Sequence, residues 1–150
     1  MREAIIKDND IHDELFEGEG SDVSVQDAVD MAGTGCRVQS IGQNFDLIGF
    51  DCQNQLQDVF ESLSAPPLSH PKFNAVVTIG RTMLFIVNAD GSTMIVDSHR
   101  HGSSSIRSCY CYCAPGKSRT LAEWLVAIHQ IYWQQDVRYC SVIPVYYMSK

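Results

Sequence analysis

Apolar residues are most concentrated in the second half of the chain, where three short runs follow one another closely. Residues 73–80 (FNAVVTIG) and 82–88 (TMLFIVN) are almost continuously apolar, which is typical of central strands buried on both faces. Residues 93–99 (TMIVDSH) form the third run. Between the last two runs, Asp90 and Gly91 favour a hairpin turn because both residues can supply positive φ angles. The pattern therefore predicts three neighbouring strands.

The clearest helical pattern covers residues 120–133. Its apolar residues recur at helical spacing and share one face: Leu121, Trp124, Leu125, Ile128, Ile131 and Tyr132. His129 lies between these positions, so we expect it at the surface. Residues 139–148 form a last apolar run, in which Pro144 favours a sheet edge or a bulge because proline has no N–H to donate. We expect this strand to join the other three in a mixed or antiparallel sheet, with the helix packed on it.

The first half of the chain predicts helices and short strands. Helices are expected over residues 3–16 and 24–33, and short strands over 36–41 and 45–50 on either side of a Gly-Gln-Asn turn. Residues 65–71 (APPLSHP) have the composition of a linker. The succession of elements indicates an α/β (α+β) fold.

A third helix is expected over residues 52–64, with Asp51 as its cap. One stripe of this helix is apolar; it contains Cys52, Leu56, Val59, Phe60 and Leu63. Cys52 follows the start of the helix, where the helix dipole favours a thiolate. The carboxylate of Asp51 opposes that charge, and the apolar neighbours of Cys52 favour a buried side chain. We therefore interpret Cys52 as a small core residue and not as a nucleophile.

Composition limits the classes of protein and partner. A chain of 150 residues with 45% hydrophobic residues predicts one globular domain over 1–150. The net charge is −7 and the eleven Lys and Arg residues are scattered, which argues against nucleic acid as a partner because phosphate binding needs a concentrated basic face. No apolar stretch approaches the roughly 20 residues that cross a membrane. Without a secretory signal at the start, the six cysteines are expected as thiols, which predicts an intracellular protein of the cytoplasm or nucleus.

Asp97 and His99 end the third apolar run and carry the candidate chemistry. Because side chains alternate along a strand, the two residues point to the same face, and Ser98 points to the other. A carboxylate beside an imidazole fixes its tautomer and stabilises its charged form, which are the two things that a general base needs. The alternative is a solvated strand end with an incidental ion pair.

The segments around this pair resemble the deubiquitinase domain of the herpesvirus large tegument protein and its cysteine-peptidase relatives. The most similar segments are Val76–Gly80, Met83–Val87, Asp90-Gly91 and Val96–Gly102, and the weaker upstream ones are SVQDAVDMAGTGCRVQ and MREAI. The resemblance implies a papain-like fold and a thiol protease that cleaves ubiquitin or a ubiquitin-like modifier through a Cys-His-Asp triad. Carried over by position, it implies that His99 is the general base and that Asp97 orients it.

The same resemblance raises a question about the nucleophile. In the family, the reactive cysteine begins a helix ahead of every segment matched here, in a QC-x-x-N stretch that this sequence does not contain. We therefore expect the 150-residue chain to be inactive by itself, either as a fragment of a hydrolase or as a pseudoenzyme. In the second case the domain is a non-catalytic module that binds ubiquitin or another protein.

The remaining cysteines offer two further alternatives, a relocated nucleophile and a zinc site. Cys36 begins an expected strand, which favours a structural role. Cys109, Cys111 and Cys113 share one face if the CYCYC segment is extended, and His99 or His101 could add a fourth ligand. Alternate residues of a strand lie about 7 Å apart, farther than the ligands of one tetrahedral zinc. We expect unpaired thiols, no metal and no cofactor.

Overall fold

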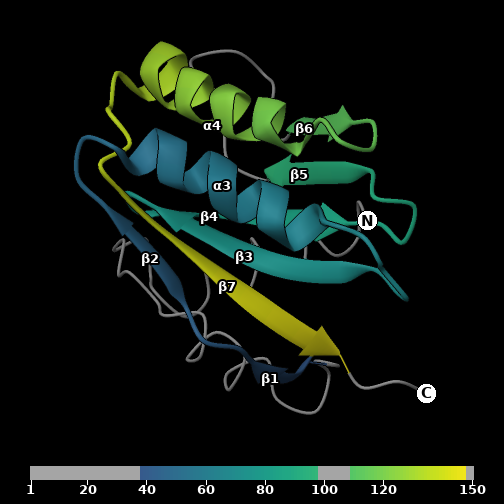
Figure 1. Ribbon diagram of the computed structural model, residues 1–150. Helices are drawn as coiled ribbons and strands as arrows, with labels where there is room; N and C mark the ends of the chain where they lie inside the picture. The colour runs from purple at the N-terminus through teal and green to yellow at the C-terminus, as the bar shows by residue number, and fades with distance from the viewer. Residues whose placement is uncertain (1–37, 98–108, 148–150) are drawn as a thin grey trace. The chain divides into compact units, whose positions relative to one another are not determined.

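The computed structural model describes residues 38–97 and 109–147, which form two helices and seven strands (Figure 1). In chain order these are β1 (Val38–Ile41), β2 (Phe45–Ile48), α3 (Cys52–Ser64), β3 (Lys72–Thr78), β4 (Arg81–Val87), β5 (Thr93–Asp97), β6 (Cys109–Cys113), α4 (Ser118–Trp133) and β7 (Tyr139–Tyr147). The architecture is α+β. The helices expected over residues 3–16 and 24–33 lie outside the described residues.

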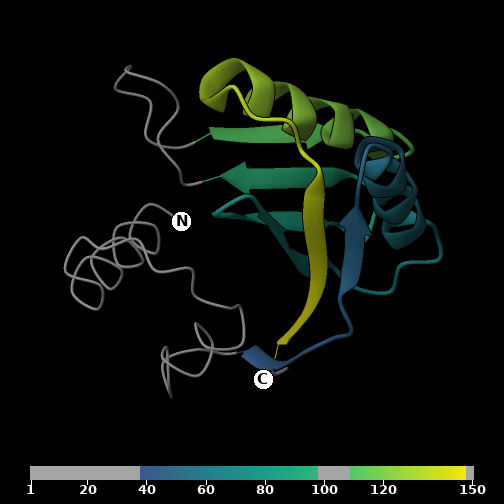
Figure 2. The ribbon, with the colours of Figure 1, turned by 90° about the vertical axis from the view of Figure 1, so that its left-hand side faces the viewer.

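All described strands belong to one antiparallel sheet. Its order is β1-β7-β3-β4-β5-β6, and β2 pairs with β7 beside β1. The prediction that the three apolar runs and the last strand are neighbours is therefore confirmed. The two short strands in the first half do not pair with each other, since each pairs with a different part of β7, as Figure 2 shows.

Pro144 lies inside the sheet, so its predicted place at an edge or a bulge is wrong. It is opposite Asn74 of β3, and the register shift of this region falls in β1 instead. The carbonyl oxygen of Pro144 accepts a hydrogen bond of 2.7 Å from the backbone N–H of Gly42, in the connection between β1 and β2. A strand residue directs its N–H and C=O to the same side. The missing N–H of Pro144 therefore faces this connection, where no ladder bond with β3 is lost.

The β4–β5 turn has the predicted position but a simpler geometry. Gly91 has a φ of 83°, whereas Asp90 is not among the described residues with positive φ. The Asp90 carboxylate instead accepts hydrogen bonds from the backbone N–H and the hydroxyl of Ser92, at 2.9 and 2.6 Å. One glycine and one side-chain acceptor are therefore enough to close the hairpin.

Both helices cover the same face of the sheet, where Figures 1 and 2 place them side by side. The predicted apolar stripe of α3 is confirmed: Cys52, Leu56 and Phe60 are fully buried. The ring of Phe60 stacks on that of Phe85 in β4, with the ring centroids 4.0 Å apart. The main core thus lies between the helices and this face of the sheet.

Helix α4 begins two residues earlier than predicted, and its last turn presents a different face. Ile131 and Tyr132 are 70% and 44% exposed, although the spacing predicted them in the core. The buried side of the helix runs instead through Leu125 and His129, and Trp133 packs against the core after them. The stripe follows a spacing of four residues, so it turns gradually around the helix and leaves Ile131 and Tyr132 outside.

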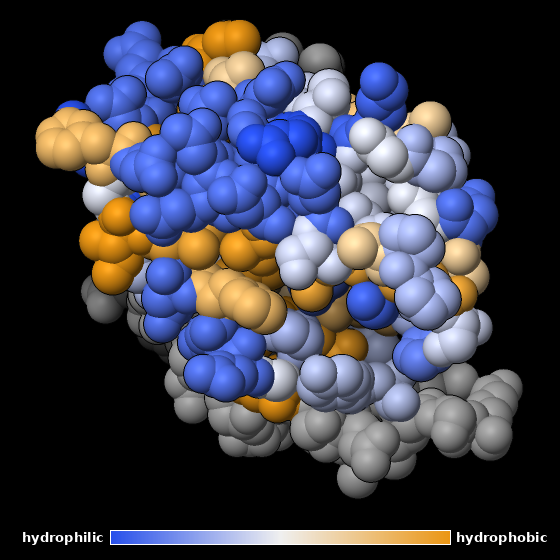
Figure 3. All heavy atoms as spheres, viewed as in Figure 1, coloured by the Kyte–Doolittle hydropathy of each residue, from blue (hydrophilic) through white to orange (hydrophobic). Residues whose placement is uncertain are grey.

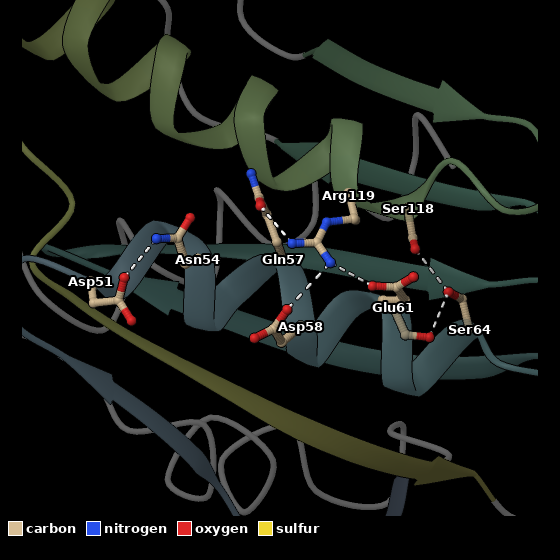
Figure 4. Close-up of polar contacts among 8 residues, drawn as sticks. All are labelled: Asp51, Asn54, Gln57, Asp58, Glu61, Ser64, Ser118 and Arg119. Carbon is tan, nitrogen blue, oxygen red and sulfur yellow. Dashed lines mark hydrogen bonds and ion pairs between the residues drawn. The ribbon is translucent and has the colours of Figure 1, made fainter.

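Polar side chains join the two helices on their outer side. Arg119 of α4 contacts Glu61 at 2.7 Å, Asp58 at 3.3 Å and Gln57 at 3.1 Å, as Figure 4 shows. Figure 3 shows the hydrophilic side chains gathered over the helical part of this face.

Asp51 precedes α3, as predicted, but its side chain does not cap the helix. The carboxylate accepts a hydrogen bond from the Asn54 side chain and none from the helix backbone.

The described residues all belong to one compact unit, Thr34–Lys150. The single domain over residues 1–150 remains a prediction. No helix among the described residues has the length and apolarity needed to cross a membrane. The intracellular location is likewise still a prediction.

Candidate functional site

Asp97 ends β5 as a completely buried residue. Thr93, Ile95 and Asp97 alternate with less buried residues along this strand, so they point to one face. Ile95 is the register partner of Phe85, which stacks on Phe60 of α3. Asp97 therefore points to the side of the sheet that the helices cover, at the end of a strand supported on both edges by β4 and β6.

His99 lies outside the described residues, because the description of β5 ends at Asp97. A contact between Asp97 and His99 therefore remains a prediction. The role of His99 as a base and that of Asp97 as its orienting group also remain predictions.

Arg81 shares the end of the sheet with Asp97. Leu84 of β4 is opposite Val96, and the next pair in the same register joins Met83 to Asp97. Arg81 is two residues from Met83 and lies on the same face, which makes it a diagonal neighbour of Asp97. Diagonal neighbours in an antiparallel pair are about 7–8 Å apart.

The guanidinium group of Arg81 is held by three contacts. It lies over the ring of Trp133, 4.0 Å from the ring centroid, and donates hydrogen bonds to the backbone oxygen of Ile79 at 3.0 Å and to Oε1 of Gln135 at 2.9 Å. Burial lowers the pKa of Arg81, while the negative charge of Asp97 acts in the opposite direction and raises it. The two charges therefore interact across the end of the sheet.

His129 is fully buried, so its predicted place at the surface is wrong. Its Nδ1 lies 2.9 Å from the backbone oxygen of Leu125, and its Nε2 lies 2.8 Å from the hydroxyl of Thr78. Since a carbonyl oxygen only accepts, Nδ1 carries the proton, and in the neutral ring Nε2 accepts from Thr78. The ring also contacts Trp133 edge to face, with centroids 4.8 Å apart. His129 thus links the end of β3 to Trp133, the residue whose ring contacts the guanidinium of Arg81.

Sequence reasoning did not connect Arg81 with Asp97, nor Trp133 and His129 with Arg81. Arg81 is the one charged residue between positions 73 and 88, and a charge within a core run is a signal for a buried partner. His129 gave no such signal, because its partner Thr78 is 51 positions away in the sequence. Only the sheet topology brings these residues together.

Cys52, Cys111 and Cys140 do not offer a reactive thiolate. Cys52 and Cys140 are fully buried, and burial raises the pKa of both thiols. Burial also raises the pKa of Cys111, and its neighbour Cys113 adds to this shift. The interpretation of Cys52 as a core residue is confirmed. Cys36 lies outside the described residues.

The CYCYC segment is extended, as the zinc alternative required, and forms β6. Within residues 38–97 and 109–147 no group of three or more His, Cys, Asp or Glu side chains could hold a metal ion.

A pocket of about 400 Å³ lies at the opposite end of the sheet from Asp97, between α3, the β4–β5 turn and the start of α4. Its walls include Ser64, Leu68, Gly91 and Pro115, and none of them belongs to the candidate site.

Comparisons with known proteins include a distant structural likeness. No known protein family matches the sequence, and no curated protein matches it. The structure resembles that of the avirulence protein AvrPphB of Pseudomonas. The TM-score is 0.48 at 10% sequence identity, over 70% of the present chain and 52% of AvrPphB. The chain therefore spans about half the length of that protein, and the comparisons assign it to no family.

Proposed function

We propose that this chain is part of a papain-like cysteine hydrolase that cleaves ubiquitin or a ubiquitin-like modifier from its conjugates. In this proposal His99 is the general base and Asp97 holds the imidazole in position. The proposal rests on the resemblance of the segments around β3, β4 and β5, and on one observation: a completely buried carboxylate at the end of a central strand.

The position of Asp97 fits an orienting carboxylate. A group that aligns a histidine must itself be immobile, and Asp97 stands on a strand paired on both sides. A carboxylate is also rarely buried unless it has a charged or hydrogen-bonding partner. The charge of Arg81 acts on Asp97 here, and a neighbouring imidazole would add a hydrogen bond.

Catalysis also needs a nucleophile, and Cys52 and Cys140 do not fit that role. A thiolate attacks, whereas a buried thiol with a raised pKa stays protonated and out of reach. Cys52 and Cys140 are of this second kind. We propose that the nucleophile of an active enzyme comes from a segment that precedes the matched residues, and that the 150-residue chain by itself does not turn over substrate.

A second candidate function is a non-catalytic module that binds ubiquitin or another protein. The burial of Cys52 and Cys140 favours it, because a domain without a usable thiol can still retain its binding surface. The two functions differ in one measurable property, namely the formation of a covalent bond with the modifier.

A ubiquitin probe with a C-terminal propargyl group tests both candidates. It is added to the 150-residue chain and to any longer natural protein that contains it, and adducts are counted by mass spectrometry. We expect no adduct with the chain alone and an adduct with the longer protein that is lost in His99→Ala. A longer protein that binds ubiquitin reversibly without an adduct indicates the binding module. Neither adduct nor binding with ubiquitin and ubiquitin-like probes contradicts both candidates.

A further inference from the structure

We propose that Arg81 is a positioning residue for the candidate catalytic carboxylate, and that its guanidinium, fixed by Trp133 and Gln135, keeps Asp97 ionised in its buried place. The catalytic part of this inference, the role of Asp97 in orienting a base, rests on the proposed function. The electrostatic relationship between Arg81 and Asp97 can be measured without any reaction.

The first step of the argument is the burial of Asp97. Transfer of an isolated carboxylate from water to the protein interior is costly, and such a group becomes protonated unless an opposite charge or hydrogen bonds compensate. A protonated carboxyl would stabilise an imidazolium far less than a carboxylate does. Asp97 is completely buried, so its orienting role depends on the charges and hydrogen bonds around it.

The second step is the position of Arg81. It lies on the helix-covered face of β4, diagonal to Asp97 in the register of β4 and β5. Further titratable residues in the described elements near this end of the sheet include Cys109 and His129. Cys109 of β6 is the register partner of Asp97, and His129 of α4 contacts Trp133. Neither brings a permanent positive charge, whereas an arginine remains charged at any pH at which the protein is folded.

The third step is the fixation of the guanidinium. Trp133 lies against its plane at 4.0 Å, and Gln135 and the Ile79 carbonyl accept its N–H groups. The cation–π contact and the two hydrogen bonds use the planar shape of arginine, which lysine does not have. Gln135 reaches Arg81 because Gln134 ends α4 in a left-handed conformation, with φ 53°. The charge is therefore held at one place and does not move freely with solvent.

The titration of Asp97 tests this relationship. Protein labelled with ¹³C at the aspartate carboxyl groups is titrated by NMR, and the Asp97 signal is assigned by its loss in Asp97→Asn. Arg81→Met removes the charge and keeps an apolar side chain against Trp133. We expect the midpoint of the Asp97 titration to rise by on the order of one pH unit, because a positive charge on the same face of the sheet favours the carboxylate. Arg81→Lys retains the charge, so its midpoint should lie between the two.

A matched control is Arg138→Met. Arg138 directly precedes β7, and its guanidinium lies over Phe50 and near Asp136. The midpoint of the Asp97 titration should therefore be unchanged in Arg138→Met. If Arg81→Met does not fold, Trp133→Leu replaces it, since it removes the ring that fixes the guanidinium. An unchanged Asp97 midpoint in every folded Arg81 or Trp133 variant contradicts the inference. A shifted midpoint, together with neither adduct formation nor binding of ubiquitin and ubiquitin-like probes by a longer natural protein that contains the chain, contradicts the proposed function alone.

Discussion

The hydroxyl group of Thr78 lies 2.8 Å from Nε2 of His129. This hydrogen bond joins the last residue of β3 to the penultimate turn of α4, and both residues are buried. Because Nδ1 of the same ring is bonded to the backbone of Leu125, the imidazole has no freedom to turn. The pair thus fixes the end of α4. This end carries Trp133, which contacts the guanidinium of Arg81.

Thr78→Val is expected to lower the free energy of unfolding by about 1–3 kcal/mol, the usual cost of leaving a buried polar group without its partner. The substitution keeps the size and branching of the side chain but removes the hydroxyl donor to His129. Urea denaturation followed by circular dichroism measures the change.

The matched cycle adds His129→Leu and the double variant. Because both single variants break the same hydrogen bond, the double variant should lose less stability than the sum of the two. Strict additivity would show that the contact between Thr78 and His129 does not contribute to stability.

Gln134→Gly is expected to stabilise the protein by about 0.5–1 kcal/mol. Gln134 ends α4 with φ 53°, a left-handed conformation that is strained for residues with a Cβ atom and natural for glycine. The control Gln130→Gly, at an exposed position inside the same helix, should instead destabilise by about 1 kcal/mol. Thermal denaturation of both variants measures the contrast, and two losses of similar size would contradict the strain at Gln134.

Because of Asp90 in the β4–β5 turn, the free energy of unfolding should depend on pH in the acidic range. Hydrogen bonds from Ser92 lower the pKa of Asp90 below its ordinary value of 3.8. The stabilisation is therefore complete above that ordinary pKa and is lost as the pH falls through the lower pKa of the folded protein. Asp90→Asn should be less stable than the wild type at pH 6, and the difference should shrink in acid. A difference that is constant between the two conditions would show that the charge of Asp90 has no part in the turn.

Local patterns in the sequence were sufficient to predict the central elements of the fold. The apolar runs predicted β3, β4 and β5 within two residues at each end, over the described part, because continuous apolar strands need no distant information to be recognised. Pro144 was placed wrongly for the opposite reason. Its tolerance inside the sheet depends on Gly42, which lies about one hundred positions earlier in the sequence, and no local rule connects the two.

In the candidate site, too, local patterns predicted some features, whereas others depend on residues that are distant in the sequence. The burial of Cys52 could be predicted from the apolar stripe of its own helix, and the structure confirms it. The contacts of Arg81 with Trp133, and of Trp133 with His129, could not be predicted, because the strand that carries Arg81 and the helix that carries the other two meet only in the folded protein. A histidine at a helical position between apolar residues has the pattern of a surface group, and only a specific hydrogen-bond partner makes its burial favourable.

Cys52 and Cys140 should resist alkylation in the folded protein. Burial raises the pKa of both thiols, so the fraction of reactive thiolate at pH 8 is below that of an exposed cysteine. Iodoacetamide labelling followed by peptide mass spectrometry should modify Cys111, which is partly exposed, before the other two. Labelling of all three in denaturant is the control. Rapid modification of Cys52 in the folded protein would restore it as a candidate nucleophile.

The purified 150-residue chain should show no turnover of a fluorogenic ubiquitin substrate. Asp97 and His99 could orient and accept a proton, but a base without a nucleophile accelerates the reaction little. A thiol must lie within hydrogen-bonding reach of the base, at roughly 4 Å or less, to transfer its proton, and Cys52 and Cys140 are enclosed in the core instead. Turnover that is lost in both His99→Ala and Cys52→Ala would contradict this expectation and make Cys52 the nucleophile. Turnover that arises only when a preceding segment with a reactive cysteine is present, and that is lost in Asp97→Asn, would identify the chain as the base-bearing part of a working protease.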